Sequence, residues 1–274
     1  MSSARDARRT AVAEEQWRTR RSAVDTSLRT SAVWTAVRDL AERQQAALGR
    51  TLRVLDLGGG TGGLAVPLAE LGHDVVVVDT SPDALASLSR RSGERGVADR
   101  VHAVQGDAES LASLTGVVGE EPFDLVCCHG TLEVVDDPRS TLAALAAVLA
   151  PGGHLSLVSA QRLAVVLARA LAGQFAQAHE ALTSVDGRWG AHDPLPRRFD
   201  ADQLAAMVEQ SGLTVDQVHG VRLFSDLVPS AFVDSEADRA ALLQLEQAAA
   251  SHPQFGFLGQ LGTTVHVLAH RAPR

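Results

Sequence analysis

A glycine-rich segment holds the residues whose types and spacing best suit the binding of a cofactor. Its sequence is DLGGGTGG, from Asp56 to Gly63, and it follows the apolar run RVL. Glycines at this spacing let the backbone turn sharply after a strand and let a ligand approach the main chain closely. The segment therefore predicts a cofactor loop at the end of a buried strand.

Two cofactor classes use a loop of this kind. The spacing Gly58-x-Gly60-x-x-Gly63 is that of a dinucleotide fingerprint. The spacing Asp56-x-Gly58-x-Gly60-x-Gly62 is that of S-adenosylmethionine (SAM) sites. A dinucleotide would bring a pyrophosphate close to the acid Asp56, whereas SAM brings an ammonium group that Asp56 can attract. The charge of the loop favours SAM, and an NAD-dependent oxidoreductase is the alternative.

Two more acidic residues close expected strands. Asp79 ends the run His73–Ser81, 19 residues after Gly60. An acid at this place can accept hydrogen bonds from ribose hydroxyls in either class of cofactor. Asp107 ends the run 101–107 and can accept a hydrogen bond from an adenine amino group, which again favours SAM.

Apolar runs alternate with helix-length segments along most of the chain. Runs of Val and Leu that are bounded by glycines indicate parallel strands buried on both faces. We therefore expect an α/β fold with a doubly wound, mostly parallel, seven-stranded sheet. Helical residues before Gly49 predict an N-terminal cap over 1–49, followed by one domain over 50–274 with inserts at about 160–200 and 225–260. The expected strands are 53–58, 73–81, 101–107, 123–130, 152–159, 213–223 and 262–271.

Composition narrows the class of protein further. The 274 residues are 45% hydrophobic with a formal net charge of -8, which excludes a disordered chain and argues against broad nucleic-acid binding. Cys127 and Cys128 are adjacent, so a disulfide framework is excluded and a reducing cytoplasm is expected. No apolar run is long enough to span a membrane, and we expect no metal site. Lys, Asn, Ile and Tyr are missing, so all 25 basic side chains are Arg.

The glycine loop, Asp79, Asp107, the FDLV run and the PGG turn occur in an order that resembles the class I SAM-dependent methyltransferases. Other segments resemble the bacterial tRNA 5-carboxymethoxyuridine methyltransferase family, which esterifies the carboxylate of a modified wobble uridine. They are Leu28-Arg29 with Trp34, CHGTLEVVDDPRSTL, VLAPGGHLSL, LPRRF, GVRLFSD and LLQLE…PQFGFLG…VHV, and together they span most of 28–270.

This resemblance implies SAM as the cofactor and tRNA as the partner. The SAM contacts that it implies are Arg29, Gly58, Gly59, Asp79, Asp107, Ala108 and His129. Arg29 could hold the methionine carboxylate through a bidentate pair. His129 ends the fourth expected strand, at the sheet edge where ligands bind in such folds, and could donate to SAM or line the substrate cavity.

Methylation of a carboxylate requires placement more than acid or base chemistry, because the carboxylate is already ionised at neutral pH. A cation should hold it, and the candidates are Arg197, Arg198 and Arg222. A small-molecule carboxylate or hydroxyl is the alternative acceptor, and a hydroxyl would need a general base, for which His129 is the first candidate. A SAM-binding protein without catalysis is a third hypothesis.

The sequence departs from the tRNA-modifying family at positions expected to face the substrate. Asp25 stands near an expected Lys, Val134 replaces a Trp, and Ser159-Ala160 replaces an aromatic-Asn step. Without Tyr, and with three Trp, the chain has few side chains for stacking on bases. These differences keep the small-molecule acceptor open.

Overall fold

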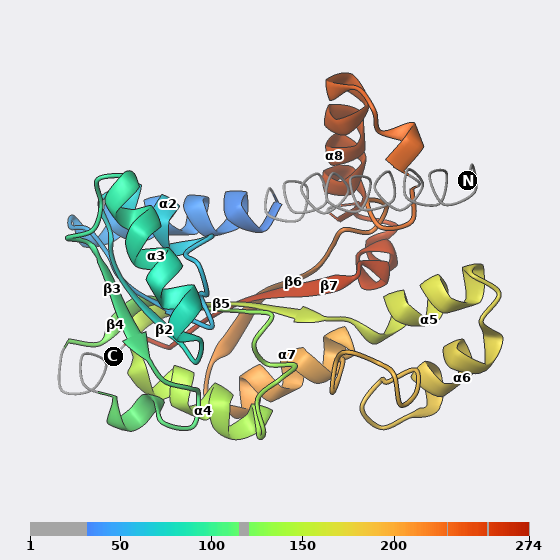
Figure 1. The fold of residues 1–274 in the computed structure, drawn as a ribbon, viewed down its shortest axis with the longest axis horizontal. Helices are drawn as coiled ribbons and strands as arrows, with labels where there is room; N and C mark the ends of the chain where they lie inside the picture. Colours follow the sequence, from blue (N-terminus) through green and yellow to red (C-terminus); the bar gives the residue numbers. More distant parts are fainter. Residues whose placement is uncertain (1–31, 115–120, 229, 251, 274) are drawn as a thin grey trace, which may run out of the picture.

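The structure is a computed structural model that describes residues 32–114, 121–228, 230–250 and 252–273 (Figure 1). Seven strands form a single sheet in the order β3-β2-β1-β4-β5-β7-β6. The chain reverses its direction of travel across the sheet between β1 and β4, which is where ligands bind in doubly wound folds. The predicted α/β fold with a mostly parallel, seven-stranded sheet is confirmed.

The parallel part of the sheet comprises the first five strands. Leu57, at the end of β1, pairs with Val78 of β2 on one side and with Cys128 of β4 on the other. The carboxyl ends of these three strands therefore meet at one edge. The strands are β1 Arg53–Leu57, β2 Asp74–Asp79, β3 Val101–Gln105, β4 Phe123–His129, β5 Leu149–Ala160, β6 Thr214–Val221 and β7 Thr264–His270.

The antiparallel exception is β7, which lies between β5 and β6 and runs opposite to both. Because β6 then runs in the same direction as β5, the carboxyl end of β6 lies at the same edge as those of the parallel strands. The expected fifth strand was too short. β5 begins at Leu149, three residues before the expected start, since Phe123 of β4 pairs with Leu149 ahead of a bulge.

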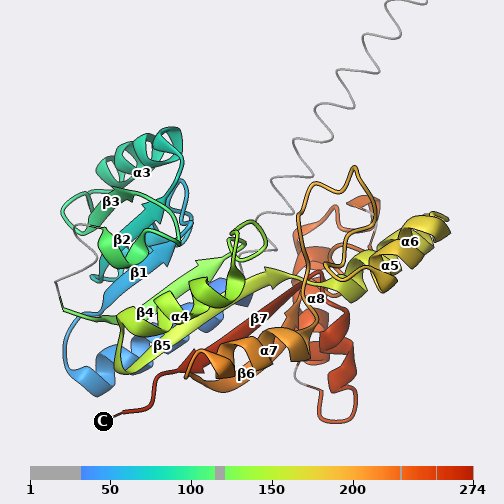
Figure 2. The ribbon, with the colours of Figure 1, turned by 90° about the horizontal axis from the view of Figure 1, so that it is seen from below.

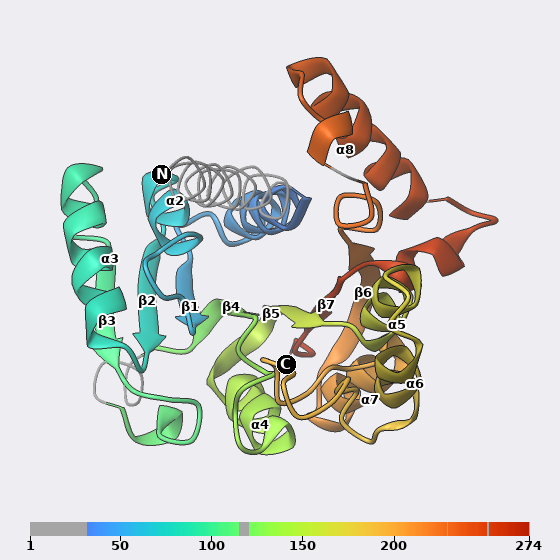
Figure 3. The same cartoon turned by 45° about the vertical axis from the view of Figure 1, so that its right-hand side comes forward.

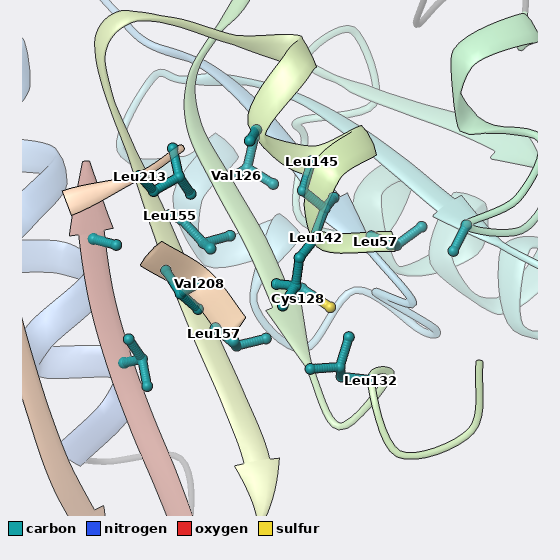
Figure 4. Close-up of a cluster of buried hydrophobic side chains, with 14 of the residues drawn as sticks. Leu57, Val126, Cys128, Leu132, Leu142, Leu145, Leu155, Leu157, Val208 and Leu213 are labelled. Carbon is teal, nitrogen blue, oxygen red and sulfur yellow. The ribbon is translucent and has the colours of Figure 1, made fainter. Parts of the chain in front are cut away.

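Helices lie on both faces of the sheet (Figure 3), and a layer of buried hydrophobic side chains lies under them on each face. Helices α4 (Pro138–Val148) and α7 (Ala201–Gln210) cover one face. The other face is covered by α2 (Ala65–Glu70), α3 (Pro82–Glu94) and the helix over 32–48, which we call the N-terminal helix. Figure 4 shows the first layer, where Cys128 of β4 packs among leucines of β1, β5 and α4 and Leu132 of the loop after β4. Cys127 points into the opposite layer, so both thiols are buried and free.

Two helices begin directly at the edge where the strands end. Ser81 caps α3 by accepting a hydrogen bond from the Ala84 N–H, and Asp137 caps α4 by accepting one from the Arg139 N–H. A proline follows each cap, with its φ already suited to the first helical turn. These local signals place the loops after β2 and β4 at the same edge as the glycine loop.

The two segments expected as inserts contain helices at one end of the sheet. Helices α5 (Arg162–Leu171) and α6 (Phe175–Thr183) extend from the end of β5 (Figure 2). The second insert contains α8 (Glu236–Ala250), between the short helices η2 (Ser230–Phe232) and η3 (Gly256–Leu261). Within the described residues, no helix has the length and apolar character needed to cross a membrane.

Candidate cofactor and acceptor site

A cavity of about 410 Å³ opens where β1, β2, β3 and β4 end. Four of the residues predicted to bind the cofactor line it: Gly58, Asp79, Asp107 and Ala108. The opposite wall is the loop that follows β4, including Gly130, Thr131, Val134, Val135 and Asp136. The structure thus brings residues from four separate strand ends around one space.

The first glycine of the loop is required by its surroundings. Gly58 has φ +73°, and its N–H donates to the Val78 carbonyl at 2.7 Å. A Cβ atom at Gly58 would lie 2.0 Å from Thr131 Oγ1, and one at Gly59 would lie 2.5 Å from Asp56 Oδ2. No other residue fits at Gly58 without displacing the wall of the cavity. The missing side chains at Gly58 and Gly59 let Thr131 and Asp56 pack directly against the loop. At Gly60 the nearest atom to a Cβ would lie 3.9 Å away, so a cofactor can approach the main chain there.

Asp79 accepts hydrogen bonds from two loops that border the cavity and can still accept hydrogen bonds from a ligand. Its Oδ2 accepts from the Gly60 N–H at 2.9 Å, and its Oδ1 accepts from the Ser81 N–H at 2.8 Å. Each carboxylate oxygen has a second lone pair. The carboxylate can therefore accept ribose hydroxyls while it fixes the glycine loop to the start of α3.

Asp107 is exposed at the far side of the cavity and is held in a local turn. Its Oδ1 accepts from the Ser110 N–H at 2.7 Å and from Ser110 Oγ. These hydrogen bonds lower the pKa of Asp107, so it is ionised at neutral pH. Ala108 is buried beside it. Ser110 was missed as a supporting residue, although an Asp followed three residues later by Ser is the spacing of such turns.

Asp56 and His129 do not line this cavity. Residues alternate between the two faces of a strand, so Asp56 shares a face with Val54, and His129 with Leu125 and Cys127. Both lie on the face that the N-terminal helix covers. Arg29, the predicted partner of the methionine carboxylate, lies outside the described residues.

The environment of Asp56 makes it unusual for a carboxyl group. It is 3% exposed, and its Oδ2 has no hydrogen-bond partner among the described residues. Burial, and secondarily the charge of Asp79, raise the pKa of Asp56 to about 7. A buried acid with an unpartnered oxygen suits a cationic group, such as the ammonium of SAM.

His129 is a weak base for a related reason. Its Nε2 lies 2.8 Å from Ser156 Oγ, and burial lowers the pKa of His129 to about 4. The imidazole is therefore neutral at physiological pH and a poor proton acceptor.

The three candidate arginines lie in different environments. Arg197 donates to the carbonyl oxygens of Val135 and Asp136, which places it at the rim of the cofactor cavity. Arg198 is buried in a bidentate ion pair with Asp193, with an Nη2–Oδ1 distance of 2.9 Å. The guanidinium of Arg198 therefore stabilises the segment after α6 and is not available to hold an acceptor carboxylate.

Arg222 lines a second cavity, of about 370 Å³, bounded by the N-terminal helix, the end of β6 and α8. It pairs with Asp226 and has φ +65°, a strained conformation for a residue with a side chain. Glu246 of α8 holds the loop in place by accepting from the N–H groups of Leu223, Phe224 and Ser225 at 2.7 to 2.8 Å. Glu246 was missed because no local spacing links it to the loop that it anchors.

The fold and this cavity define a class I SAM-dependent methyltransferase. A family model described as "Methyltransferase domain" matches residues 29–218. The chain belongs to the SAM-dependent methyltransferases. SAM is accordingly its cofactor, and the alternative of an NAD-dependent oxidoreductase is discarded.

The resemblance stated from the sequence is confirmed by a relative of matching length. The tRNA 5-carboxymethoxyuridine methyltransferase of Escherichia coli K12 is 32% identical over 245 residues, which cover 89% of this chain and 88% of that protein. A ubiquinone biosynthesis O-methyltransferase of Xanthomonas oryzae pv. oryzae is 36% identical, over 44% of this chain and 48% of its own length.

Solved structures support the fold. A sarcosine dimethylglycine methyltransferase of Galdieria sulphuraria superposes with a TM-score of 0.56 at 16% identity, covering 90% of this chain and 86% of its own. The magnesium protoporphyrin IX methyltransferase of Synechocystis, solved with S-adenosylhomocysteine (SAH), gives a TM-score of 0.55 at 14% identity with the same coverage. Across the described ranges, no group of three or more His, Cys, Asp or Glu side chains could hold a metal ion.

Proposed function

We propose that this protein transfers the methyl group of SAM to the carboxylate of 5-carboxymethoxyuridine in tRNA, forming a methyl ester. The observation that carries the proposal is the 32% identity to a methyltransferase with that substrate over 88% of its length. The similarity covers 89% of this chain and so extends beyond the core that methyltransferases with unrelated substrates share. A tRNA substrate implies a cytoplasmic enzyme.

We assign the cofactor contacts as follows. Asp79 accepts the ribose hydroxyls, Asp107 and Ala108 bound the adenine, and the backbone at Gly58, Gly59 and Gly60 allows close approach. Asp56 attracts the ammonium, while Arg29 and His129 contact the methionine part. When bound, SAM supplies an electrophilic methyl group on a sulfonium.

The residues of the chain then need to orient the acceptor. An acceptor carboxylate oxygen forms a bond to the methyl carbon as the sulfur–carbon bond breaks, and the products are the ester and SAH. No proton is transferred in this step. Arg197 is the cation best placed to hold the carboxylate, since it is anchored on two carbonyls of the cavity wall. This is catalysis by proximity and orientation.

The environment of His129 favours a carboxylate over a hydroxyl acceptor. A hydroxyl needs a base whose pKa lies near the working pH, and burial lowers the pKa of His129 to about 4. A carboxylate needs no base.

One observation favours a second candidate, a small-molecule carboxylate as the acceptor. Val134, where the tRNA-modifying family carries a Trp, lines the cofactor cavity and is 56% exposed. A valine offers no face on which a base can stack. Among the other departures, Ser159 is fully buried, and Asp25 lies outside the described residues.

The test is deletion of the gene from its host, followed by mass spectrometry of tRNA nucleosides. We expect the methyl ester to disappear and 5-carboxymethoxyuridine to accumulate, with rescue by the intact gene and not by a Gly58→Ala variant. An unchanged ester level, or a host tRNA without either nucleoside, would overturn the tRNA assignment. Methyl transfer to a small carboxylate by the purified protein would then support the second candidate, and absence of transfer to any acceptor would favour a SAM-binding protein without catalysis.

A further inference from the structure

A row of four polar side chains crosses the sheet on the face covered by the N-terminal helix. His129 of β4 lies 2.8 Å from Ser156 of β5, measured from Nε2 to Oγ. Ser156 Oγ lies 2.9 Å from Nε2 of His266 in β7. His266 Nδ1 lies 3.2 Å from Nε2 of His219 in β6. Four adjacent strands thus contribute one side chain each to a continuous chain of hydrogen bonds.

One end of the row lines the second cavity, and the other end adjoins a residue of the cofactor cavity. His129 immediately precedes Gly130, which lines the cofactor cavity, whereas His219 lines the second cavity next to Arg222. The two middle members, Ser156 and His266, are fully buried, and the end members are half-buried. Polar groups buried in a sheet cost free energy unless they are hydrogen-bonded, and the row gives Ser156 and His266 these partners.

All three imidazoles of the row are neutral at physiological pH. Burial lowers the pKa of His129 and of His219, and burial together with the neighbouring imidazoles lowers that of His266. A neutral imidazole has one N–H donor and one bare nitrogen that accepts, and a serine hydroxyl has one proton to donate. Each member can therefore donate along the row in one direction only.

With the hydroxyl proton of Ser156 donated to one of its two imidazole neighbours, this proton count leaves two arrangements of the row. In the first, His219 Nε2–H donates to His266, His266 donates to Ser156, and Ser156 donates to Nε2 of His129. His129 then carries its proton on Nδ1. In the second, every bond is reversed, so His129 donates from Nε2 and its Nδ1 is bare. A change of direction at His219 is therefore a change of tautomer at His129.

We propose that His129, Ser156, His266 and His219 form a hydrogen-bond relay through which the second cavity sets the tautomer of His129 at the cofactor edge. An anionic group that accepts a hydrogen bond from His219 Nδ1–H selects the second arrangement, and a donor to that nitrogen selects the first. Ser156, His266 and His219 are positioning residues, because they act through His129. The relay rests on the geometry of the row, and its effect on methyl transfer rests on the proposed function.

The relay is tested by NMR on the full chain labelled with ¹⁵N-histidine and saturated with SAH. The ring ¹⁵N shifts of His129 report which nitrogen carries the proton. We expect His219→Gln to move these shifts, although His219 does not touch His129. The control is His179→Gln on the exposed surface of α6, which should leave the His129 signals unchanged.

Repeating the experiment in a variant whose row is interrupted distinguishes the relay from a general structural effect of the substitution. Ser156→Ala removes the hydroxyl that joins the two halves, so His219→Gln should no longer move the His129 shifts in that background. If Ser156→Ala does not fold, judged by circular dichroism, His266→Leu interrupts the next link. Unchanged His129 shifts in His219→Gln, or equal changes in the cut background, would overturn the proposal. No acceptor is needed, so failure of the tRNA assignment leaves this result unaffected.

Discussion

Gly58 and Thr131 are in direct contact across the strand ends of β1 and β4. A Cβ atom on Gly58 would lie 2.0 Å from Thr131 Oγ1, and Thr131 Oγ1 itself donates to the Leu57 carbonyl at 3.1 Å. This hydrogen bond thus links the loop after β4, which forms one wall of the cavity, to the beginning of the glycine loop. The shape of the cofactor cavity depends on the absence of a side chain at this position.

We therefore expect Gly58→Ala to lose SAM binding. The methyl group would clash with Thr131, and alanine at φ +73° adds strain of about 1–3 kcal/mol. Calorimetry with SAM and thermal denaturation should show an affinity reduced at least about tenfold and a lower Tm. Gly63→Ala is the matched control, because nothing lies within 4 Å of a Cβ built there. Equal behaviour of the two variants would contradict the argument.

Asp79→Asn should weaken SAM binding while the fold is retained. The amide keeps the size of the side chain but loses the charge, and hydrogen bonds to a charged group contribute about 1.5–3 kcal/mol each. We expect an affinity about 10- to 100-fold lower by calorimetry. Asp83→Asn removes the same charge from an exposed position in the first turn of α3 and should change little. An unchanged affinity in Asp79→Asn would remove Asp79 from the cofactor contacts.

SAM affinity should depend on pH between 6 and 7 through Asp56. Its pKa is raised to about 7, so the ionised fraction rises from about one tenth at pH 6 to about one half at pH 7. If the ionised form attracts the ammonium, the affinity increases about fivefold over this interval, while the ammonium stays protonated. Calorimetry in buffers of different ionisation enthalpy should detect proton release on binding. In Asp56→Asn the dependence should vanish, and an equal dependence in both proteins would exclude Asp56 as its source.

The parts of the site that lie near each other in sequence could be predicted from it. The loop from Asp56 to Gly63 follows its strand directly, and Asp79 ends the next one, so the order of strands in a doubly wound sheet brings them together. The second cavity could not be predicted. It depends on Glu246 of α8 reaching a loop more than twenty residues earlier.

The histidine row was missed for a related reason. Ser156 and His266 are 110 residues apart, and they meet because β7 inserts between β5 and β6. An antiparallel strand inserted in this way leaves no periodic signal in the sequence. His129 was predicted from its strand end alone, without the partners that determine its protonation.

Adjacent arginines show another limit of sequence reasoning. Arg197 and Arg198 were equal candidates, and only the direction of each side chain separates them. We expect Arg198→Met to destabilise the fold by about 3–5 kcal/mol, because it leaves the buried carboxylate of Asp193 unpaired. Urea denaturation measures this change. A loss below about 1 kcal/mol, as for an exposed pair, would contradict the buried pairing.

Arg197→Met should leave stability and SAM affinity nearly unchanged and impair methyl transfer. Arg197 is half-buried at the rim of the cofactor cavity, where it donates to two main-chain carbonyls, and within the described residues it is not part of a buried ion pair. Removing a charged hydrogen bond to the acceptor should lower kcat/KM about 10- to 100-fold. Arg197→Lys keeps the charge but not the bidentate fork, so an intermediate rate would show that geometry contributes as well as charge.

The measurement is transfer of labelled methyl from SAM to tRNA isolated from the deletion strain, with Arg139→Met, an exposed arginine of α4, as the control. Full activity of Arg197→Met would move the acceptor carboxylate elsewhere, and Arg222 of the second cavity would then be the remaining candidate among the three arginines.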